Sequence, residues 1–256
     1  RITLIVDGVF LTKSVDELFR THELLTIPFM TGVNNDEGGW LLSNVSLNAT
    51  EICGMDREHI MNLLNMFYPD VRQTVLDFTI LDLLVDDYIG SGEDRVKNRD
   101  GYTQIIGDMM FTLPAIRTAN VHRGAPVYLY EYQHSPRSMQ TRRPSFVGSD
   151  HGDEILTVFG FLFDQIIIIL EACHEEEEQL SRTMMSYWAN FARTGSPNGD
   201  GLVHWPKYGA EEDYLSIDVN EQVTGQHLKK DKFVFLTRTL PEKIRQHKEK
   251  EERNEL

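Results

Sequence analysis

The sequence predicts an α/β fold, because short strand-like segments alternate along the chain with long segments of helical apolar spacing. The segment 28–33 is apolar and leads into a polar loop, which predicts a short buried strand. The segment 125–132 is rich in β-branched and aromatic residues and predicts a second buried strand. With 41% hydrophobic and 10% aromatic residues in a length of 256, the composition is that of an ordinary globular chain.

Apolar residues at helical spacing predict four helices along the chain. The predicted ranges are 56–69, about 71–89, about 102–121 and about 175–194. Pro69 should end the first helix, and Pro114 should kink or divide the third, because proline has no backbone N–H to donate. Gly195 and Pro197 should close the fourth.

The C-terminal part is more polar. Short apolar pieces at 214–217 and 233–236 flank a polar turn region, and 241–256 predicts an exposed, charged helix or tail. No internal repeat and no clear linker divides the chain, so we expect one domain over 1–256, or part of one. The apolar run that starts directly after Arg1 suggests that the chain begins inside a domain.

The longest apolar run lies within 155–170 and is interrupted by Asp164 and Gln165. It is shorter than the ~18–20 apolar residues that a membrane span needs, so we expect a buried core segment and no transmembrane helix. The acidic run 175–178 favours a solvated helix start over a metal site, because carboxylates suit the positive end of a helix dipole.

The charge balance limits the function. The chain has 25 Lys and Arg residues against 40 Asp and Glu residues, a formal net charge of −15, which argues against binding to nucleic acid. The glycine-rich phosphate motifs and the HExxH zinc motif are absent from the sequence, and no cysteine–histidine cluster has metal spacing. These absences argue against nucleotide-dependent enzymes and zinc enzymes of the HExxH type.

Several short signals concern the compartment. Asn44 and Asn48 each begin a glycosylation sequon, and the last four residues, 253–256 (RNEL), resemble the KDEL class of retrieval signals in their final Glu-Leu. Together they predict the endoplasmic reticulum lumen, with a retrieval receptor as a partner, or secretion. Cys53 and Cys173 are either two free thiols or a disulfide, and the sequence leaves both open.

Two loops carry groups suited to catalysis. Each places a titratable side chain beside glycine after an apolar segment: Glu37 in the loop 34–40, and His151 in the loop 150–154. A buried carboxylate can hold an imidazole in one tautomer, and the imidazole can then move a proton between a nucleophile and a leaving group. A structural or surface role remains open for either loop from spacing alone.

Several segments resemble one family. They are 7–11 (DGVFL), 31–40 (TGVNNDEGGW), 150–154 (DHGDE), 187–199 (YWANFARTGSPNG) and 204–206 (HWP). They are similar to the C-terminal part of the type-B carboxylesterases, the carboxylesterase/cholinesterase family of the α/β-hydrolase fold. The segments 175–188 and 240–244 look closest to the vertebrate type-2 carboxylesterases.

The resemblance implies a fold and roles for particular residues. It implies the C-terminal part of an α/β-hydrolase, with a mostly parallel central sheet flanked by helices and the N-terminal half missing. By position, Glu37 matches the acid of the catalytic triad and His151 matches its general base. The nucleophilic serine, in a GxSxG turn, and the HGGG-type oxyanion loop are both absent from this sequence. The chain alone should therefore be inactive.

The resemblance also suggests where substrate binds and where this chain differs. Met109, Met110 and Phe111 match a segment beside the acyl pocket, although an ordinary helix core remains an equal alternative. Relatives usually have a bulky residue where Gly38 stands, and we expect the glycine to loosen the packing beside Glu37. The isoleucine-rich segment 161–173 is either a variant loop or an error in the sequence.

Three functions remain in view. The first is the C-terminal part of a serine hydrolase that acts on small carboxylic esters, thioesters or amides through an acyl-enzyme. The resemblance to the esterases implies neither a metal nor an organic cofactor for it. The second is a non-catalytic, cholinesterase-like adhesion or binding module, against which the retained Glu37 and His151 argue. The third is the product of a degenerate or partial esterase gene, which sequence alone does not separate from the first.

Overall fold

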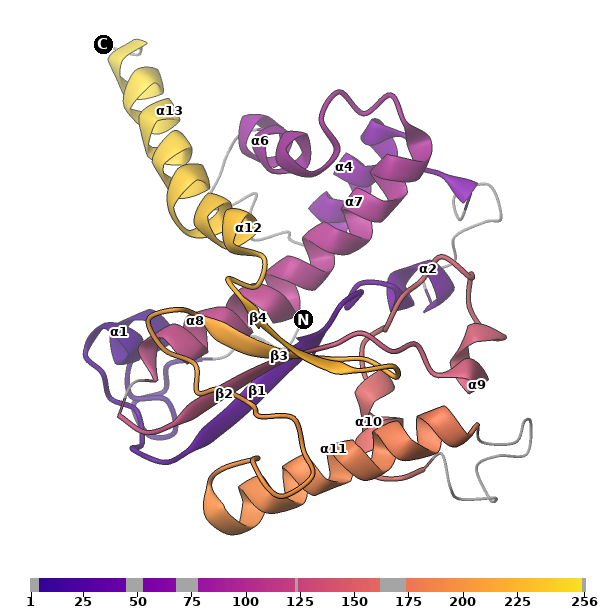
Figure 1. Cartoon of the computed structure of the whole chain (residues 1–256). Coiled ribbons are helices and arrows are strands. Elements are labelled where there is room, and N and C mark those ends of the chain that lie inside the picture. The colour runs from indigo at the N-terminus through magenta and orange to yellow at the C-terminus, as the bar shows by residue number, and fades with distance from the viewer. Residues whose placement is uncertain (1–4, 45–52, 68–77, 123, 162–173, 255–256) are drawn as a thin grey trace.

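We analysed a computed structural model of the chain, which describes residues 5–44, 53–67, 78–122, 124–161 and 174–254. A central sheet lies between helices above and below it in Figure 1. The strands are β1 (Phe29–Asn34), β2 (Val127–Tyr132), β3 (Asp213–Ile217) and β4 (Gln222–Gln226). The α-helices are α1 (Val15–Arg20), α2 (Trp40–Asn44), α4 (Arg57–Phe67), α6 (Phe78–Ile89), α7 (Arg95–Gly107), α8 (Leu113–Val121), α9 (Arg137–Gln140), α10 (Asp153–Val158), α11 (Glu175–Thr194), α12 (Lys230–Val234) and α13 (Leu240–Asn254). Two π-helical turns, η1 (Asp108–Thr112) and η2 (Phe235–Thr239), complete the described elements.

The sheet is mostly parallel, in the order β1-β2-β3-β4. β1 pairs in parallel with β2, β2 pairs in parallel with β3, and β4 closes an antiparallel hairpin with β3. The carboxyl ends of β1 and β2 therefore lie at the same edge, where Asn34 is opposite Tyr132. This arrangement confirms the predicted α/β class and brings the loops that follow the two strands together.

β2 is buried along its whole length because its two faces are covered by different helices. Its three tyrosines (Tyr128, Tyr130 and Tyr132) pack with Leu180, Met184 and Tyr187 of α11. Leu129, which points to the opposite face, packs with Ile116 of α8. The Trp205 indole packs in the same cluster as the three tyrosines, and it donates a hydrogen bond to the Leu129 carbonyl (2.9 Å).

The predicted third helix is longer and more complex than expected. It begins at Arg95, because the Asp94 side chain accepts the N–H groups of Val96 and Lys97 and so caps the helix. The π-helical turn η1 interrupts the regular helix directly before α8, in which Pro114 lies in the first turn. Pro114 thus divides the segment as predicted, since a proline is tolerated only in the first turn of a helix.

The prediction of a buried core segment at 155–170 is wrong for the part that the structure describes. Ile155 is 46% exposed, Phe159 67% and Phe161 36%. α10 is short and packs only one side against α11, where Thr157 is buried and accepts a hydrogen bond from Ser181. The remaining residues of the isoleucine-rich segment, 162–173, lie outside the described residues.

The other predicted helices are present in the described part of the structure. The predicted helix at 56–69 is α4, and the fourth helix matches α11, which ends at Gly195 in the left-handed conformation. α6 covers the second half of the predicted helix at 71–89, and 71–77 lie outside the described residues. The charged C-terminal segment forms α13, which projects from the body of the molecule in Figure 1.

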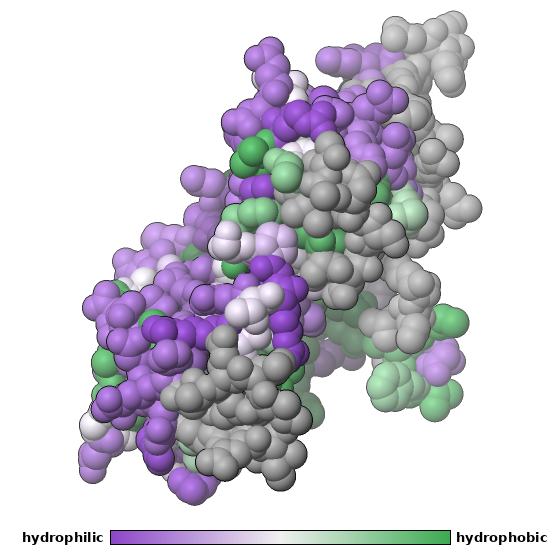
Figure 2. All heavy atoms as spheres, turned by 90° about the vertical axis from the view of Figure 1, so that its right-hand side faces the viewer, coloured by the Kyte–Doolittle hydropathy of each residue, from purple (hydrophilic) through white to green (hydrophobic). Residues whose placement is uncertain are grey.

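The surface agrees with the acidic, polar composition. Among the coloured side chains in Figure 2, most are hydrophilic, and hydrophobic ones form smaller groups between and beside them. Among the described helices, none combines the length with the apolar character that a membrane crossing requires. Asn44 is the last residue of α2 and Cys53 is a free, exposed thiol, whereas Asn48 and Cys173 lie outside the described residues.

Candidate active site

Glu37 is positioned by the tight loop that follows β1. The last strand residue, Asn34, donates its backbone N–H to Glu37 Oε1 at 2.7 Å. Glu37 is only 7% exposed, so its carboxylate lies at the carboxyl edge of the sheet, away from solvent. The backbone of β1 therefore fixes one oxygen of the carboxylate and leaves Oε2 for another partner.

The structure brings the two predicted side chains together. His151 Nδ1 lies 2.7 Å from Glu37 Oε2, although the two residues are 114 positions apart in the sequence. The imidazole is 51% exposed, so a buried acid holds a histidine that solvent and small molecules can reach. Since Nδ1 faces the carboxylate, Nε2 is directed away from it and is available for proton transfer.

The ring of Phe111 stacks on the imidazole of His151. The ring centroids are 4.2 Å apart and the planes differ by 27°. The other two residues of the predicted pocket segment lie elsewhere: Met109 is partly buried against the core formed by α4, α6 and α7, and Met110 is 43% exposed. The segment is thus partly core and partly site, with Phe111 alone in contact with His151.

Hydrogen bonds from backbone N–H groups join the two loops beside Glu37 and His151. The Asp36 N–H donates to the Ser149 carbonyl at 2.9 Å. The Ser149 N–H donates to Asn35 Oδ1 at 2.8 Å, and the Gly148 N–H donates to Asp36 Oδ2 at 3.0 Å. The loop after β1 and the loop before His151 are therefore held together at three points next to the pair.

Burial raises the pKa of the Glu37 carboxyl above its ordinary value, and the hydrogen bonds from the Asn34 N–H and from His151 act against that rise. Because the carboxylate is poorly solvated here, its hydrogen bond to the imidazole is stronger than it would be in water.

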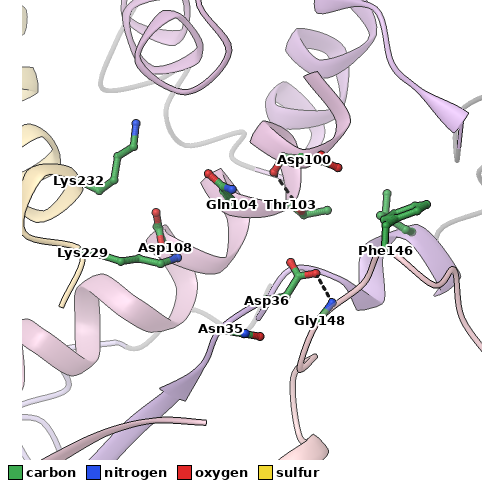
Figure 3. A pocket seen from close by; sticks show the side chains of 11 residues that line it. Asn35, Asp36, Asp100, Thr103, Gln104, Asp108, Phe146, Gly148, Lys229 and Lys232 are labelled. Atoms are coloured by element: carbon green, nitrogen blue, oxygen red, sulfur yellow. Dashed lines mark hydrogen bonds and ion pairs between the residues drawn. The ribbon is translucent and has the colours of Figure 1, made fainter. Parts of the chain in front are cut away.

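A cavity of about 510 Å³ lies on the other side of the same loop, lined by Asp36 rather than by Glu37 or His151. Figure 3 shows Asp36 and Gly148 on one wall and Asp108 with Lys229 on another. Lys229 Nζ pairs with Asp108 Oδ1 at 2.6 Å, so the cavity walls carry charges that are largely matched. Asp36 therefore faces this cavity, whereas its neighbour Glu37 faces His151.

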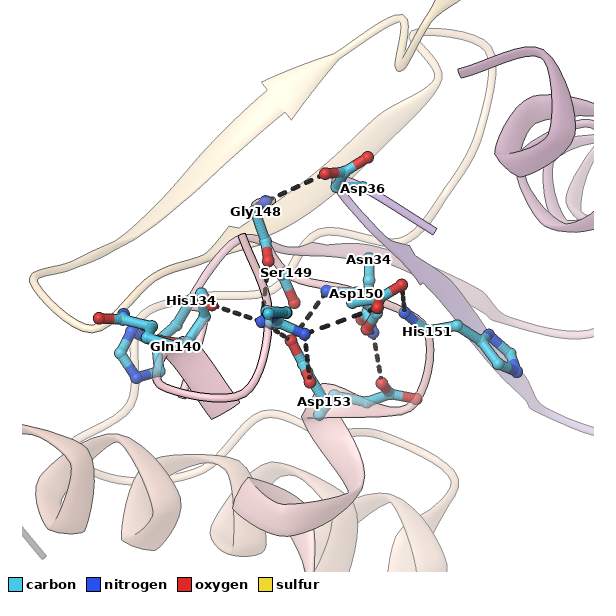
Figure 4. Close-up of polar contacts among 12 residues, drawn as sticks. Asn34, Asp36, His134, Gln140, Gly148, Ser149, Asp150, His151 and Asp153 are labelled. Atoms are coloured by element: carbon cyan, nitrogen blue, oxygen red, sulfur yellow. Dashed lines mark hydrogen bonds and ion pairs between the residues drawn. The ribbon is translucent and has the colours of Figure 1, made fainter. Parts of the chain in front are cut away.

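Sequence reasoning did not find the polar cluster beneath His151. Arg143, from the loop rich in Ser, Pro and Arg, is buried and makes a two-point ion pair with Asp153. Asp150 accepts the backbone N–H groups of Trp40 (2.8 Å) and His151 (2.7 Å). Figure 4 shows these groups together, with the His151 ring projecting away from them. Their only sequence signal was the acidic composition of 150–154.

A second histidine–glutamate pair lies away from this site. His134 Nε2 is 2.7 Å from Glu177 Oε1, and both side chains are buried. Glu177 was predicted to belong to a solvated helix start, and that is wrong for this residue, because α11 turns its Glu177 side toward the loop after β2. Within the described chain, no group of three His, Cys, Asp or Glu side chains could hold a metal ion.

The expectation that Gly38 loosens the packing beside Glu37 is wrong. A Cβ atom on Gly38 would lie 2.1 Å from the Thr103 carbonyl oxygen in α7. The loop backbone therefore packs directly against the helix, and the absence of a side chain is what permits this close approach.

Comparison with known proteins identifies the family. The model of the carboxylesterase family matches residues 2–236. The chain is 39% identical to acylcarnitine hydrolase of Mus musculus and 40% identical to cocaine esterase of Homo sapiens, over 99% and 98% of its own length and 44% of theirs. It is 38% identical to liver carboxylesterase of Sus scrofa, over 90% of this chain and 40% of that protein. The chain spans less than half the length of these relatives, and it belongs to the carboxylesterase family.

Proposed function

We propose that this chain supplies the acid and the base of a serine carboxylic-ester hydrolase. Residues 1–256 would be the C-terminal portion of a single carboxylesterase domain, and the serine and oxyanion loop would come from residues outside this sequence. The contact between His151 Nδ1 and Glu37 Oε2 carries the proposal, because an imidazole held by a buried carboxylate is the base that acyl transfer needs.

In this mechanism His151 Nε2 accepts the serine proton as the serine attacks the ester carbonyl, and it returns that proton to the leaving alcohol. The same nitrogen then activates water to hydrolyse the acyl-enzyme. Glu37 keeps the Nδ1–H toward itself and stabilises the imidazolium that forms in each step. The stacked Phe111 ring would limit rotation of the base while the acyl group is bound.

Small esters, thioesters or amides would be the substrates. The names of the relatives include an acylcarnitine hydrolase, a cocaine esterase and a medium-chain fatty acyl-CoA hydrolase, which are enzymes for esters and a thioester. Residence in the endoplasmic reticulum lumen or secretion, glycans on Asn44 and Asn48, and a retrieval receptor for the 253–256 tetrapeptide belong to the same proposal.

The test uses this chain preceded by a segment that carries the serine, taken from its own coding sequence or, as a chimera, from human cocaine esterase; we refer to it as the complete enzyme. We expect it to hydrolyse p-nitrophenyl acetate, and we expect His151→Ala to slow hydrolysis by at least about 10³-fold. His227→Ala is the matched control, because His227 is as exposed as His151 and also faces a glutamate, Glu212 at 3.3 Å, but belongs to the loop after β4.

Each outcome has a clear meaning. A folded complete enzyme whose rate is the same with and without His151 would overturn the assignment of the base and favour a non-catalytic binding module. Hydrolysis by the 256-residue chain alone that depends on His151 would overturn the proposal that the nucleophile lies elsewhere.

A further inference from the structure

Asp150 occupies the position where the acid's loop and the base's loop meet. Its Oδ1 accepts the N–H of Trp40, three residues after Glu37, and the N–H of His151 itself. Its backbone carbonyl accepts the Asn34 side-chain amide at 2.5 Å. Asp150 is thus bonded to both ends of the loop 34–40, at Asn34 and Trp40, and also to the backbone N–H of His151.

The local backbone is shaped to let this carboxylate in. A Cβ atom on Gly39 would lie 3.1 Å from Asp150 Cγ and 2.5 Å from Val147 Cγ1. A side chain at position 39 would therefore collide with Val147 and would also crowd the carboxylate beside the Trp40 N–H. The absence of that side chain is a second sign, independent of the hydrogen bonds, that the loops are built around Asp150.

The charge of Asp150 needs its own explanation. Asparagine could accept the same two N–H groups without the cost of burying a charge, and burial raises the pKa of Asp150 to about 6. Arg143 Nη1 lies 3.7 Å from Asp150 Oδ2, so the ionised form has a cationic partner. Asp153 opposes that charge, and the Asn34 amide links the Asp150 carbonyl to Glu154 Oε2. Figure 4 shows Asp150 and Asp153 within one polar cluster.

We propose that Asp150 is a positioning residue of the hydrolase: its carboxylate fastens the loop of Glu37 to the loop of His151 and keeps His151 Nδ1 on the acid, and it does so fully only when ionised. This rests on the proposed function, because it assigns Asp150 to the same catalytic pair. Charged acceptors make the stronger hydrogen bonds to N–H groups, so protonation of Asp150 weakens both links at once.

The direction of the pH effect follows from the raised pKa. Above about pH 6 Asp150 is ionised and the loops are fastened, whereas below it the carboxyl is neutral and Arg143 keeps only its ion pair with Asp153. His151 must also be unprotonated to act as a base, so two ionisations on the acid side control the reaction. The acid limb of log kcat/KM in the complete enzyme should therefore be steeper than one proton allows, with a slope approaching about two.

The experiment compares Asp150→Asn with Asp108→Asn in the complete enzyme. Asp108 is the matched control, because it is also buried and has a cationic partner, Lys229 at 2.6 Å, but its carboxylate binds Lys229 and Tyr88 beside the cavity of Figure 3 instead of the loops of Glu37 and His151. We expect Asp150→Asn to lower kcat by about 10- to 100-fold, the cost of a misplaced base, and to reduce the acid-limb slope to about one. We expect Asp108→Asn to change neither kcat nor the slope.

A second readout separates this proposal from the function on which it rests. The proton between His151 Nδ1 and Glu37 should give a downfield NMR signal, which Asp150→Asn should shift or broaden and Asp108→Asn should leave in place. If His151→Ala abolishes hydrolysis but Asp150→Asn changes neither the slope nor this signal, the positioning role is wrong and the hydrolase function stands. If His151→Ala has no effect on the rate, the function fails, and the signal still decides whether Asp150 positions the pair.

Gly39→Ala covers the case in which Asp150→Asn fails to fold. It alters no charge, and its Cβ crowds both Val147 and the Asp150 carboxylate that accepts the Trp40 N–H. We expect a lower kcat with a similar KM, together with the same change in the downfield signal. An unchanged kcat and signal in folded Gly39→Ala would also overturn the positioning role.

Discussion

Glu37→Gln changes one atom of the proposed acid and should invert the tautomer of the base. The carboxylate has two donors, the Asn34 backbone N–H on Oε1 and His151 Nδ1 on Oε2, both at 2.7 Å. A backbone N–H cannot become an acceptor, so the glutamine must place its oxygen on Asn34. Its NH₂ group then faces His151 Nδ1, which must lose its hydrogen and accept a bond instead. The hydrogen moves to Nε2, and the imidazole can no longer take a proton from a serine.

The expected magnitude is a large loss of rate with little loss of stability. A wrong tautomer in a catalytic triad costs about 10⁴-fold in kcat, and we expect a loss of that order for the complete enzyme with p-nitrophenyl acetate. The melting temperature should stay the same or rise, because glutamine fills the same volume and removes a buried charge whose pKa is already raised by burial.

Two measurements check this reasoning. Steady-state kinetics give kcat and KM, and ¹⁵N chemical shifts of the His151 ring report which nitrogen carries the hydrogen. A variant that keeps its rate within tenfold of the parent would refute the role of Glu37. A large loss of rate with the hydrogen still on Nδ1 would refute the tautomer argument while leaving the acid important.

Three further predictions concern other contacts. Burial alone would raise the pKa of Glu177, but the hydrogen bonds from His134 and a backbone N–H hold it below its ordinary value of 4.5. The stabilisation from the His134–Glu177 pair is therefore present above pH 4.5 and lost as pH falls through the lowered pKa. Glu177→Ala should lower the free energy of unfolding in urea by about 3–5 kcal/mol at pH 7 but by much less at low pH. Gly38→Ala should lower the free energy of unfolding by about 1–3 kcal/mol, because its Cβ meets a carbonyl of α7, and an unchanged melting temperature would contradict that close packing. Phe111→Ala should lower kcat about two- to tenfold through loss of the stack on His151, whereas Phe111→Tyr should retain the rate.

The strands and the long helices could be predicted because their signals are local. β2 is apolar throughout since both of its faces are covered, and α11 has an apolar face and ends at a glycine. β4 gave no such signal: its sequence, QVTGQ, has neither alternation nor an apolar run, and it exists because it pairs with β3. The start of α7 was missed because one side chain, Asp94, decides it.

The candidate site was predictable only in part. Glycine-bearing loops after apolar segments marked Glu37 and His151, but local spacing carries no information on a contact between residues 114 positions apart. The resemblance to a family supplied that pairing. Arg143 and Asp150 were missed because their roles depend on burial, and a charged residue in a polar loop has the same sequence signature whether it is exposed or buried.

These contacts also determine which part of the proposed catalytic site lies within this chain. The loop of Glu37 is joined to the loop of His151 through Asp36, Ser149 and Asp150, and all these contacts lie within the chain. The tautomer of the imidazole is set by Glu37, whose other oxygen is fixed by the backbone of β1. The orientation of the His151 imidazole is therefore set by contacts within this chain. Under the proposed function, a segment that supplies the nucleophilic serine would only have to bring it to Nε2.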